Sequence, residues 1–224
     1  MYRYHYLAQC RSVIDPETYF RECIPLLHDR MKESSIHHLS LFHSNSRLFL
    51  YYESPLKDAD PHYLFQPCES GLECWPGADM PRRWVPMMDI FHYLQPVSEE
   101  HWRRTEPVSK PFARIARLKP EQVASYIFYH YQYQEERPGD GDKYGMIALH
   151  ENLMFFYSES PATIEPPPYE GKLTTSHTPS EWQAAMDPHF IPWEEESGHS
   201  LIWLEIPLLF QLQGNETIGG EQVR

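Results

Sequence analysis

The sequence predicts an α+β protein built from two copies of one module of about 105 residues. The clearest evidence is a pair of seven-residue segments, 49–55 (FLYYESP) and 155–161 (FFYSESP). They are identical at five positions and lie 155 − 49 = 106 residues apart. A shorter match, 15–17 (DPE) with 119–121 (KPE), keeps the same order at a spacing of 104. Two ordered matches at nearly one spacing indicate a tandem duplication.

A third match pairs Trp84 and Met88 with Trp182 and Met186, at a spacing of 182 − 84 = 98. Residues four apart share one face of a helix, so each pair predicts a helix late in its module. The shorter spacing implies that the first copy carries about eight extra residues before this helix.

Each module begins with an alternating segment, 3–9 or 112–118, which is typical of a strand. Pro16 and Pro120 follow and suit the first turn of a helix, where the missing N–H is not needed. In the first copy, apolar residues then recur at helical spacing from Phe20 to Met31. Pro25 lies within this stretch and should kink the helix.

Two hairpins are expected next. Residues 37–43 and 47–53 flank the polar turn SNS in the first copy. Residues 144–150 and 153–159 flank EN in the second. Short polar turns between strand-like runs predict antiparallel pairs.

Closing strands near 99–106 and 200–212 would complete a βαββαβ order in each copy, which is a ferredoxin-like unit. A linker is expected at 105–111. The expected parts are a first module, a second module and a polar tail, at 1–106, 107–212 and 213–224. Since the bare face of each sheet must be buried, we expect the modules to pack as a pseudo-twofold dimeric α+β barrel within one chain.

Charge and cysteine content limit the partners and the compartment. There are 19 Lys and Arg against 32 Asp and Glu, a net charge of −13, which disfavours nucleic acid and anionic membranes as partners. No charged segment followed by an apolar one marks a secretory signal, so a cytoplasmic protein is expected. The four cysteines are irregularly spaced in the first half, and this favours free thiols.

Tyr126 and His130 form the most specific local pattern, because four residues apart they project from one helix face. Imidazole titrates near neutrality and serves as a general acid or base, which the phenol can orient. Alternatively, His130 is simply a partly exposed helix residue among many tyrosines.

The pattern Tyr126-x3-His130, then Tyr144 at a strand start, then Trp182-x3-Met186 resembles the L-rhamnose mutarotase family. The second copy has Glu and Gln where that family has an Arg and a second Trp around the first Trp.

The first copy keeps Arg83, Trp84 and Met88, but its Tyr19-x3-Cys23 has cysteine at the family's histidine position.

The resemblance implies a mutarotase that interconverts the anomers of a rhamnose-like monosaccharide without metal or cofactor. It implies His130 as acid/base, with Tyr126 and Tyr144 as hydrogen-bonding partners. Trp182 would be a platform for the sugar, and Met186 would form part of the pocket wall. Trp84 and Met88 would line an altered or relic pocket in the first copy.

Three alternatives stay open. The chain is a non-catalytic carbohydrate- or small-molecule-binding protein with a degraded site, or it is a cofactor-free or haem oxygenase on the same barrel. A metal site at His37, His38 and His43 is the third, although extended-strand spacing holds His37 and His43 about 20 Å apart. We expect a monomer acting as a pseudo-dimer, or a weak homo-oligomer.

Overall fold

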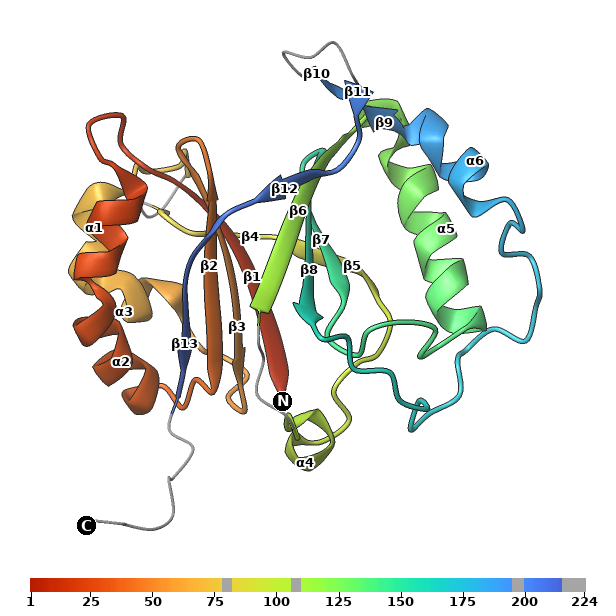
Figure 1. The fold of residues 1–224 in the computed structure, drawn as a ribbon, viewed down its shortest axis with the longest axis horizontal. Coiled ribbons are helices and arrows are strands. Elements are labelled where there is room, and N and C mark those ends of the chain that lie inside the picture. Colours follow the sequence, from red (N-terminus) through yellow and green to blue (C-terminus); the bar gives the residue numbers. More distant parts are fainter. Residues whose placement is uncertain (78–81, 106–109, 195–199, 215–224) are drawn as a thin grey trace. The chain divides into compact units, whose positions relative to one another are not determined.

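The computed structural model describes residues 1–77, 82–105, 110–194 and 200–214. The chain is α+β and has two antiparallel sheets, each with helices on one face (Figure 1). It divides into two compact units, Met1–Val85 with Leu209–Arg224, and Pro86–Leu208. Each unit is described by itself.

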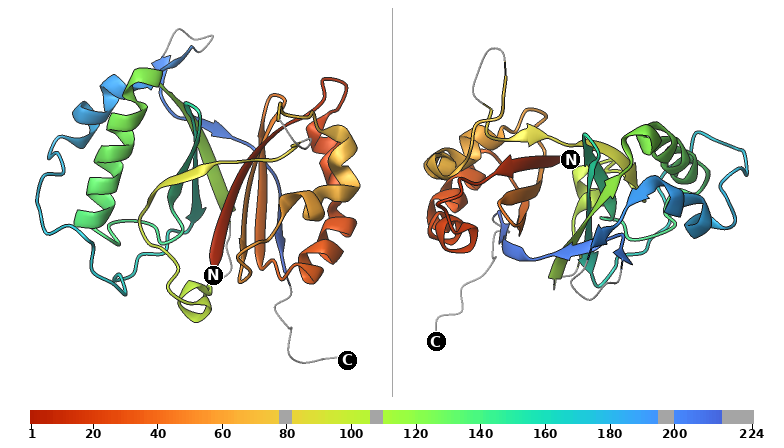
Figure 2. Two further views of the ribbon diagram at one scale, coloured as in Figure 1. Left: turned by 180° about the vertical axis from the view of Figure 1, so that it is seen from behind. Right: turned by 90° about the horizontal axis from the view of Figure 1, so that it is seen from above.

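The first unit contains a five-stranded sheet in the order β13-β2-β3-β1-β4. Its strands are β1 (Tyr2–Gln9), β2 (His38–Ser44), β3 (Arg47–Ser54), β4 (Val85–Pro86) and β13 (Leu208–Gln213). Its helices are α1 (Pro16–Glu22), α2 (Ile24–Glu33), α3 (Pro61–Phe65) and η1 (Gln66–Gly71). The helices cover one face of the sheet, as Figure 2 shows from two further sides.

The predicted first helix of this unit is present as two pieces. Asp15 caps α1 by accepting a hydrogen bond from the backbone N–H of Thr18, and Pro16 occupies its first turn. The helix is interrupted at Cys23, and Pro25 lies in the first turn of α2. In place of one helix kinked at Pro25, the structure therefore has two helices that meet at Cys23.

The second unit contains a six-stranded sheet in the order β12-β6-β8-β7-β5, with β9 also paired to β6. Its strands are β5 (Met88–His92), β6 (Lys110–Leu118), β7 (Met146–His150), β8 (Leu153–Ser160), β9 (Phe190–Ile191) and β12 (Leu204–Ile206). Its helices are α4 (Glu99–Trp102), η2 (Pro120–Gln122), α5 (Val123–Glu136), α6 (Trp182–Met186) and η3 (Asp187–His189). A small ribbon of β10 (Trp193–Glu194) and β11 (Ser200–Leu201) completes it.

Both predicted hairpins are confirmed, and they have the same geometry. Strand β2 pairs with β3, and β7 pairs with β8, each across a two-residue turn. The first turn residues, Asn45 and Glu151, have φ of 52° and 54° and so lie in the left-handed region.

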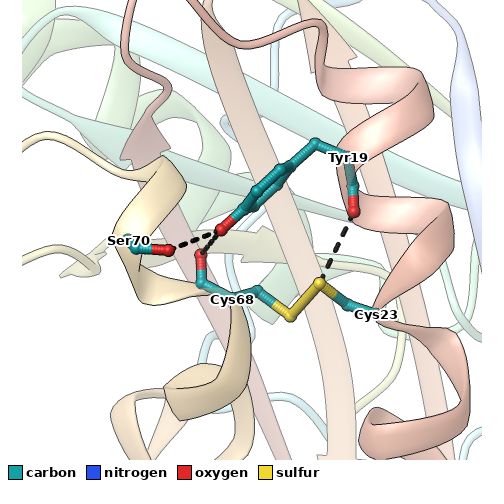
Figure 3. The surroundings of a disulfide bond; sticks show 4 residues. All are labelled: Tyr19, Cys23, Cys68 and Ser70. Carbon is teal, nitrogen blue, oxygen red and sulfur yellow. Dashed lines mark hydrogen bonds between the residues drawn. A yellow bond between two sulfur atoms is a disulfide. The ribbon is translucent and has the colours of Figure 1, made fainter.

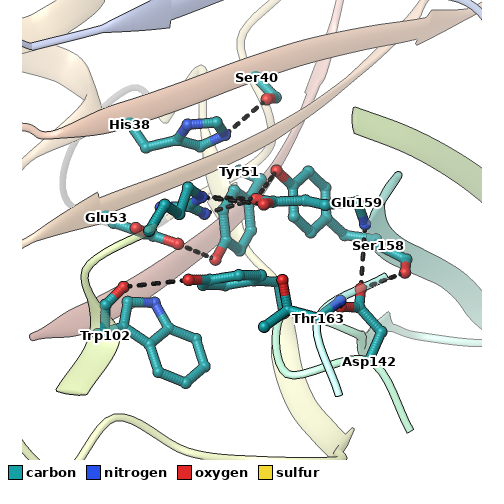
Figure 4. A network of polar contacts seen from close by, with 12 residues as sticks. His38, Ser40, Tyr51, Glu53, Trp102, Asp142, Ser158, Glu159 and Thr163 are labelled. Atoms are coloured by element: carbon teal, nitrogen blue, oxygen red, sulfur yellow. Dashed lines mark hydrogen bonds and ion pairs between the residues drawn. The ribbon is translucent and has the colours of Figure 1, made fainter. Parts of the chain in front are cut away.

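A buried hydrogen bond also recurs at the spacing of the sequence repeat. The Tyr51 hydroxyl donates to Glu53 in β3 at 2.5 Å, and the Tyr157 hydroxyl donates to Glu159 in β8 at 2.8 Å. The members of each pair are two residues apart and therefore point to the same face of their strand, as Figure 4 shows for Tyr51 and Glu53. In the second unit, Arg104 adds two hydrogen bonds to the Glu159 carboxylate through its Nε and Nη2 atoms.

Three predicted elements differ from the structure. No helix carries Trp84 and Met88: Trp84 precedes β4, and Met88 begins β5. Pro86 lies between them, and it lacks the N–H that a helix interior needs. The predicted closing strand at 99–106 is wrong, because 99–102 is helix α4, capped by the side chain of Ser98.

The predicted closing strand at 200–212 is split into β11, β12 and β13, with Pro207 between the last two. Of the expected linker at 105–111, residues 106–109 lie outside the described residues, and Lys110 and Pro111 open β6.

The compact units divide the chain at different places from the expected modules 1–106 and 107–212. Strand β5 comes from the first expected module, but it pairs with β7 in the second sheet. Strand β13 comes from the second expected module, but it pairs with β2 in the first sheet. The proposed tail at 213–224 falls almost entirely outside the described residues.

Candidate functional site

Helix α5 places Tyr126 and His130 against the sheet of the second unit. They lie four residues apart on its buried face and are exposed by only 2% and 4%. Their rings stack, with centroids 3.9 Å apart. The surrounding core includes Ala116 from β6 and Leu149 from β7, so the apolar face of the sheet holds this face of the helix.

The surroundings of His130 determine both its tautomer and its charge. Its Nδ1 lies 3.0 Å from the carbonyl oxygen of Tyr126. A carbonyl oxygen can only accept, so Nδ1 carries the proton and Nε2 keeps its lone pair. Burial disfavours the charged form and lowers the pKa of His130 to about 4, although the bond to Tyr126 acts in the opposite direction. At neutral pH, His130 is therefore a neutral acceptor.

The two residues line a cavity of about 400 Å³ in the second unit. Aromatic rings supply half of its sixteen lining residues. Besides Tyr126 and Trp182, the rings belong to Phe91, Tyr93, Tyr133, Phe156, Phe190 and Trp203. Such a wall suits a flat apolar ligand.

Helix α6 supplies Trp182 and Met186 to the same cavity. The indole centroid of Trp182 lies 5.0 Å from the imidazole of His130 and 5.0 Å from the ring of Tyr133. Met186 is buried, with 3% exposure. The structure thus brings together Tyr126, His130, Trp182 and Met186, which the sequence placed in one site.

The cavity also carries charge of one sign only. Arg114 from β6 and Arg137, which follows α5, are among its lining residues. Among the described residues that line it, none is an aspartate, a glutamate or a lysine. Ser180 and Gln183 supply uncharged polar groups.

The structure does not bring Tyr144 into this cavity. Tyr144 is 1% exposed and packs edge to face on Trp102, with centroids 5.1 Å apart. Its hydroxyl donates to the carbonyl oxygen of Trp102 at 3.4 Å, and the guanidinium of Arg104 lies 4.2 Å from its ring centroid. The ring of Tyr144 therefore packs against Trp102 and Arg104 and is not among the residues that line the cavity.

Trp84 and Met88 do not form a second pocket wall together. Trp84 is buried in the core of the first unit, with its ring centroid 4.7 Å from that of Phe65. Met88 lies in β5 of the second unit and is 55% exposed. With no helix linking them, they do not share a face.

The first unit has a disulfide at the position that corresponds to His130. Cys23 is bonded to Cys68, and the Cys23 sulfur lies 3.5 Å from the carbonyl oxygen of Tyr19 (Figure 3). The Tyr19 hydroxyl donates to the carbonyl oxygen of Cys68 at 3.2 Å. The expectation of free thiols is therefore wrong for this pair, and it holds for Cys10 and Cys74.

Sequence reasoning missed the segment that carries one wall of the cavity. Glu136, the last residue of α5, accepts hydrogen bonds from the backbone N–H groups of His177 and Thr178 and from the hydroxyls of Thr175 and Thr178. Desolvation alone would raise the pKa of Glu136. The four hydrogen bonds outweigh it and hold this pKa below its ordinary range. Pro179 follows directly and lines the cavity, so Glu136 anchors this wall to α5.

Within the described ranges, no three His, Cys, Asp or Glu side chains gather as a metal ion would require. No described helix is long and apolar enough to cross a membrane.

The chain matches no family model and no curated protein. It is similar to the solved structure of a candidate monooxygenase from Fusobacterium nucleatum, with 8% identity, a TM-score of 0.43, and coverage of 94% of this chain and 93% of that one. It is also similar to a candidate monooxygenase from Lactobacillus acidophilus, with 8% identity, a TM-score of 0.47, and coverage of 95% and 97%. At this identity and TM-score, neither similarity says what the cavity binds.

Proposed function

We propose that the second unit binds a small molecule with a flat apolar body, and that His130 accepts a hydrogen bond or a proton from the polar end of that molecule. The observation that carries this proposal is the neutral imidazole of His130. Its Nδ1 is occupied by the Tyr126 carbonyl oxygen, and Nε2 keeps its lone pair in a ring-lined cavity.

The depressed pKa of His130 favours a neutral hydrogen-bond acceptor over an acid. At neutral pH the imidazole has no second proton to give, since its pKa is about 4. A weakly acidic hydroxyl can donate to Nε2. If the proton moves to Nε2, the anion left on the ligand lies beside the new imidazolium and offsets the cost of burying its charge.

A second candidate is the interconversion of monosaccharide anomers. The convergence of Tyr126, His130 and Trp182 favours it, because an indole can stack on a sugar face. Anomerisation also needs a group that donates a proton to the ring oxygen. Burial raises the pKa of Tyr126, so its hydroxyl stays protonated, and this reading would use it as a hydrogen-bond donor to the ring oxygen.

The alternatives of non-catalytic binding and of cofactor-free or haem oxygenation would use the same cavity. The pseudo-twofold barrel, the state as a monomer or weak homo-oligomer, and the absence of nucleic-acid and membrane partners stay predictions.

Tryptophan fluorescence tests the proposal, because Trp182 and Trp203 line the cavity. We expect saturable quenching by 2-naphthol and weaker binding of 2-methoxynaphthalene, which has no hydroxyl to donate. His130→Asn should weaken 2-naphthol binding about fivefold, the equivalent of one hydrogen bond of about 1 kcal/mol. His28→Asn, in α2 of the first unit, is the matched control and should bind 2-naphthol like the parent chain.

L-Rhamnose added to the same samples separates the candidates. Faster exchange between its anomers, seen by NMR and lost in His130→Asn, would favour the mutarotase. If 2-naphthol does not bind, or binds equally well to the His130 variant, the proposal is wrong.

A further inference from the structure

The charge of the cavity contrasts with the charge of the chain. The protein has 32 acidic and 19 basic residues, yet the charged side chains among the described residues that line the cavity are Arg114 and Arg137. They come from different elements, a strand and the end of a helix. Two cations that converge on one aromatic cavity in an acidic protein point to an anionic ligand group.

Neither guanidinium is neutralised by a described carboxylate at ion-pair distance. The ion pairs of the described residues use other cations, such as Arg83 with Glu69 and Lys172 with Glu135. Glu205 faces Arg114 across the β12–β6 pair and is its nearest acidic neighbour in register, but the two form no ion pair.

Each of the two guanidinium groups also has an aromatic ring within cation–π distance. Arg114 lies 5.5 Å from the ring centroid of Phe112, and Arg137 lies 5.7 Å from that of Tyr133. Rings beside a guanidinium hold its plane and leave its N–H edge free to bind a carboxylate with two parallel hydrogen bonds.

Helix α5 sets the distance between the backbone positions of His130 and Arg137. Arg137 follows His130 by 137 − 130 = 7 residues, which is about 10 Å along the axis of α5. A ligand that reaches both must therefore be elongated. Its anionic end would meet the guanidinium groups, its body would lie against the rings, and its donor would reach Nε2 of His130.

We propose that this cavity selects aromatic carboxylates that carry a hydroxyl at the opposite end of the ring system. This inference rests on the function proposed above. Arg114 and Arg137 bind the carboxylate, and His130 binds the hydroxyl. The step is binding alone, with no bond made or broken.

The test compares three probes by tryptophan fluorescence: 6-hydroxy-2-naphthoate, its uncharged primary amide, and 2-naphthol. We expect the carboxylate to bind about 10-fold more tightly than the amide, as for a hydrogen bond to a charged group. Added salt should weaken binding of the carboxylate and leave 2-naphthol unaffected, because Arg114 and Arg137 are both exposed residues.

Variants assign the effect to the two side chains. Arg137→Gln and Arg114→Gln should each reduce the preference for the carboxylate over the amide, and the double variant should abolish it. Arg103→Gln is the matched control, since it removes one exposed positive charge from the same unit outside the cavity. Far-UV circular dichroism checks that each variant is folded.

The outcomes separate this inference from the function it rests on. Equal binding of carboxylate and amide, or loss of the preference in Arg103→Gln as well, overturns the inference and leaves the 2-naphthol result intact. Carboxylate binding that needs the arginines but not His130 supports the carboxylate site at Arg114 and Arg137 and contradicts the role given to His130 in both proposals. If no probe binds, both are wrong.

Discussion

The depressed pKa of His130 makes a quantitative prediction about stability. The ordinary pKa of histidine is 6.5, and burial lowers that of His130 to about 4. Between these two pH values the unfolded chain binds a proton that the native His130 does not. The free energy of unfolding therefore falls as the pH drops from 6.5 towards 4. The difference of 6.5 − 4 = 2.5 pH units, at about 1.4 kcal/mol each, corresponds to about 3 kcal/mol.

His130→Asn removes this titration and keeps a side-chain N–H that can reach the Tyr126 carbonyl oxygen. We expect the variant to be less stable than the parent at pH 7, because the stacked ring is lost. Its loss of stability between about pH 7 and pH 4.5 should be about 2 kcal/mol smaller than that of the parent.

Urea unfolding of the full chain at several pH values, followed by tryptophan fluorescence, measures this difference. Tyr126→Phe is the control. It changes the adjacent ring but leaves His130 in place, so it should keep the pH dependence of the parent. If the parent and His130→Asn lose stability with the same pH slope, the assignment of a neutral, buried His130 is refuted.

Three further predictions concern the scaffold. Glu136→Ala should weaken 2-naphthol binding about 3- to 10-fold by releasing the 175–178 segment, and unchanged binding would contradict its anchoring role. Gly171→Ala should lower the free energy of unfolding by about 1–3 kcal/mol in thermal unfolding, because its Cβ would lie 1.9 Å from a backbone carbonyl oxygen. Mass spectrometry without reductant should find Cys23 linked to Cys68. Since the bond spans 45 residues, reduction should cost up to about 4 kcal/mol in urea unfolding, and free thiols would refute the pairing.

Local features of the sequence were sufficient for the hairpins and for the helix faces that the site residues share. Alternating residues around short polar turns predicted β2–β3 and β7–β8, because side-chain alternation and turn chemistry act over a few residues. The four-residue spacings of Tyr126 with His130 and of Trp182 with Met186 predicted shared helix faces. That the two pairs line one cavity followed from the family resemblance, and the structure shows the same convergence.

Other features depended on contacts between distant segments. The same Trp-x3-Met pattern forms a helix at 182–186 and none at 84–88, where Pro86 and pairing of β5 with β7 favour extended chain. Tyr144 was placed with His130, but it packs on Trp102, a residue 42 positions away. Spacing along the chain carries no information about such partners.

The sequence by itself determined the repeated strands and the helix that bears His130. These follow from periodicity and composition, which act locally. Only the tertiary structure decided that strands β5 and β13 pair outside their expected modules, that Cys23 is joined to Cys68, and that two arginines converge on one cavity. The physical reason is that sheet edges, disulfides and cavity walls are made by residues far apart in sequence, whose pairing depends on the packing of the whole unit.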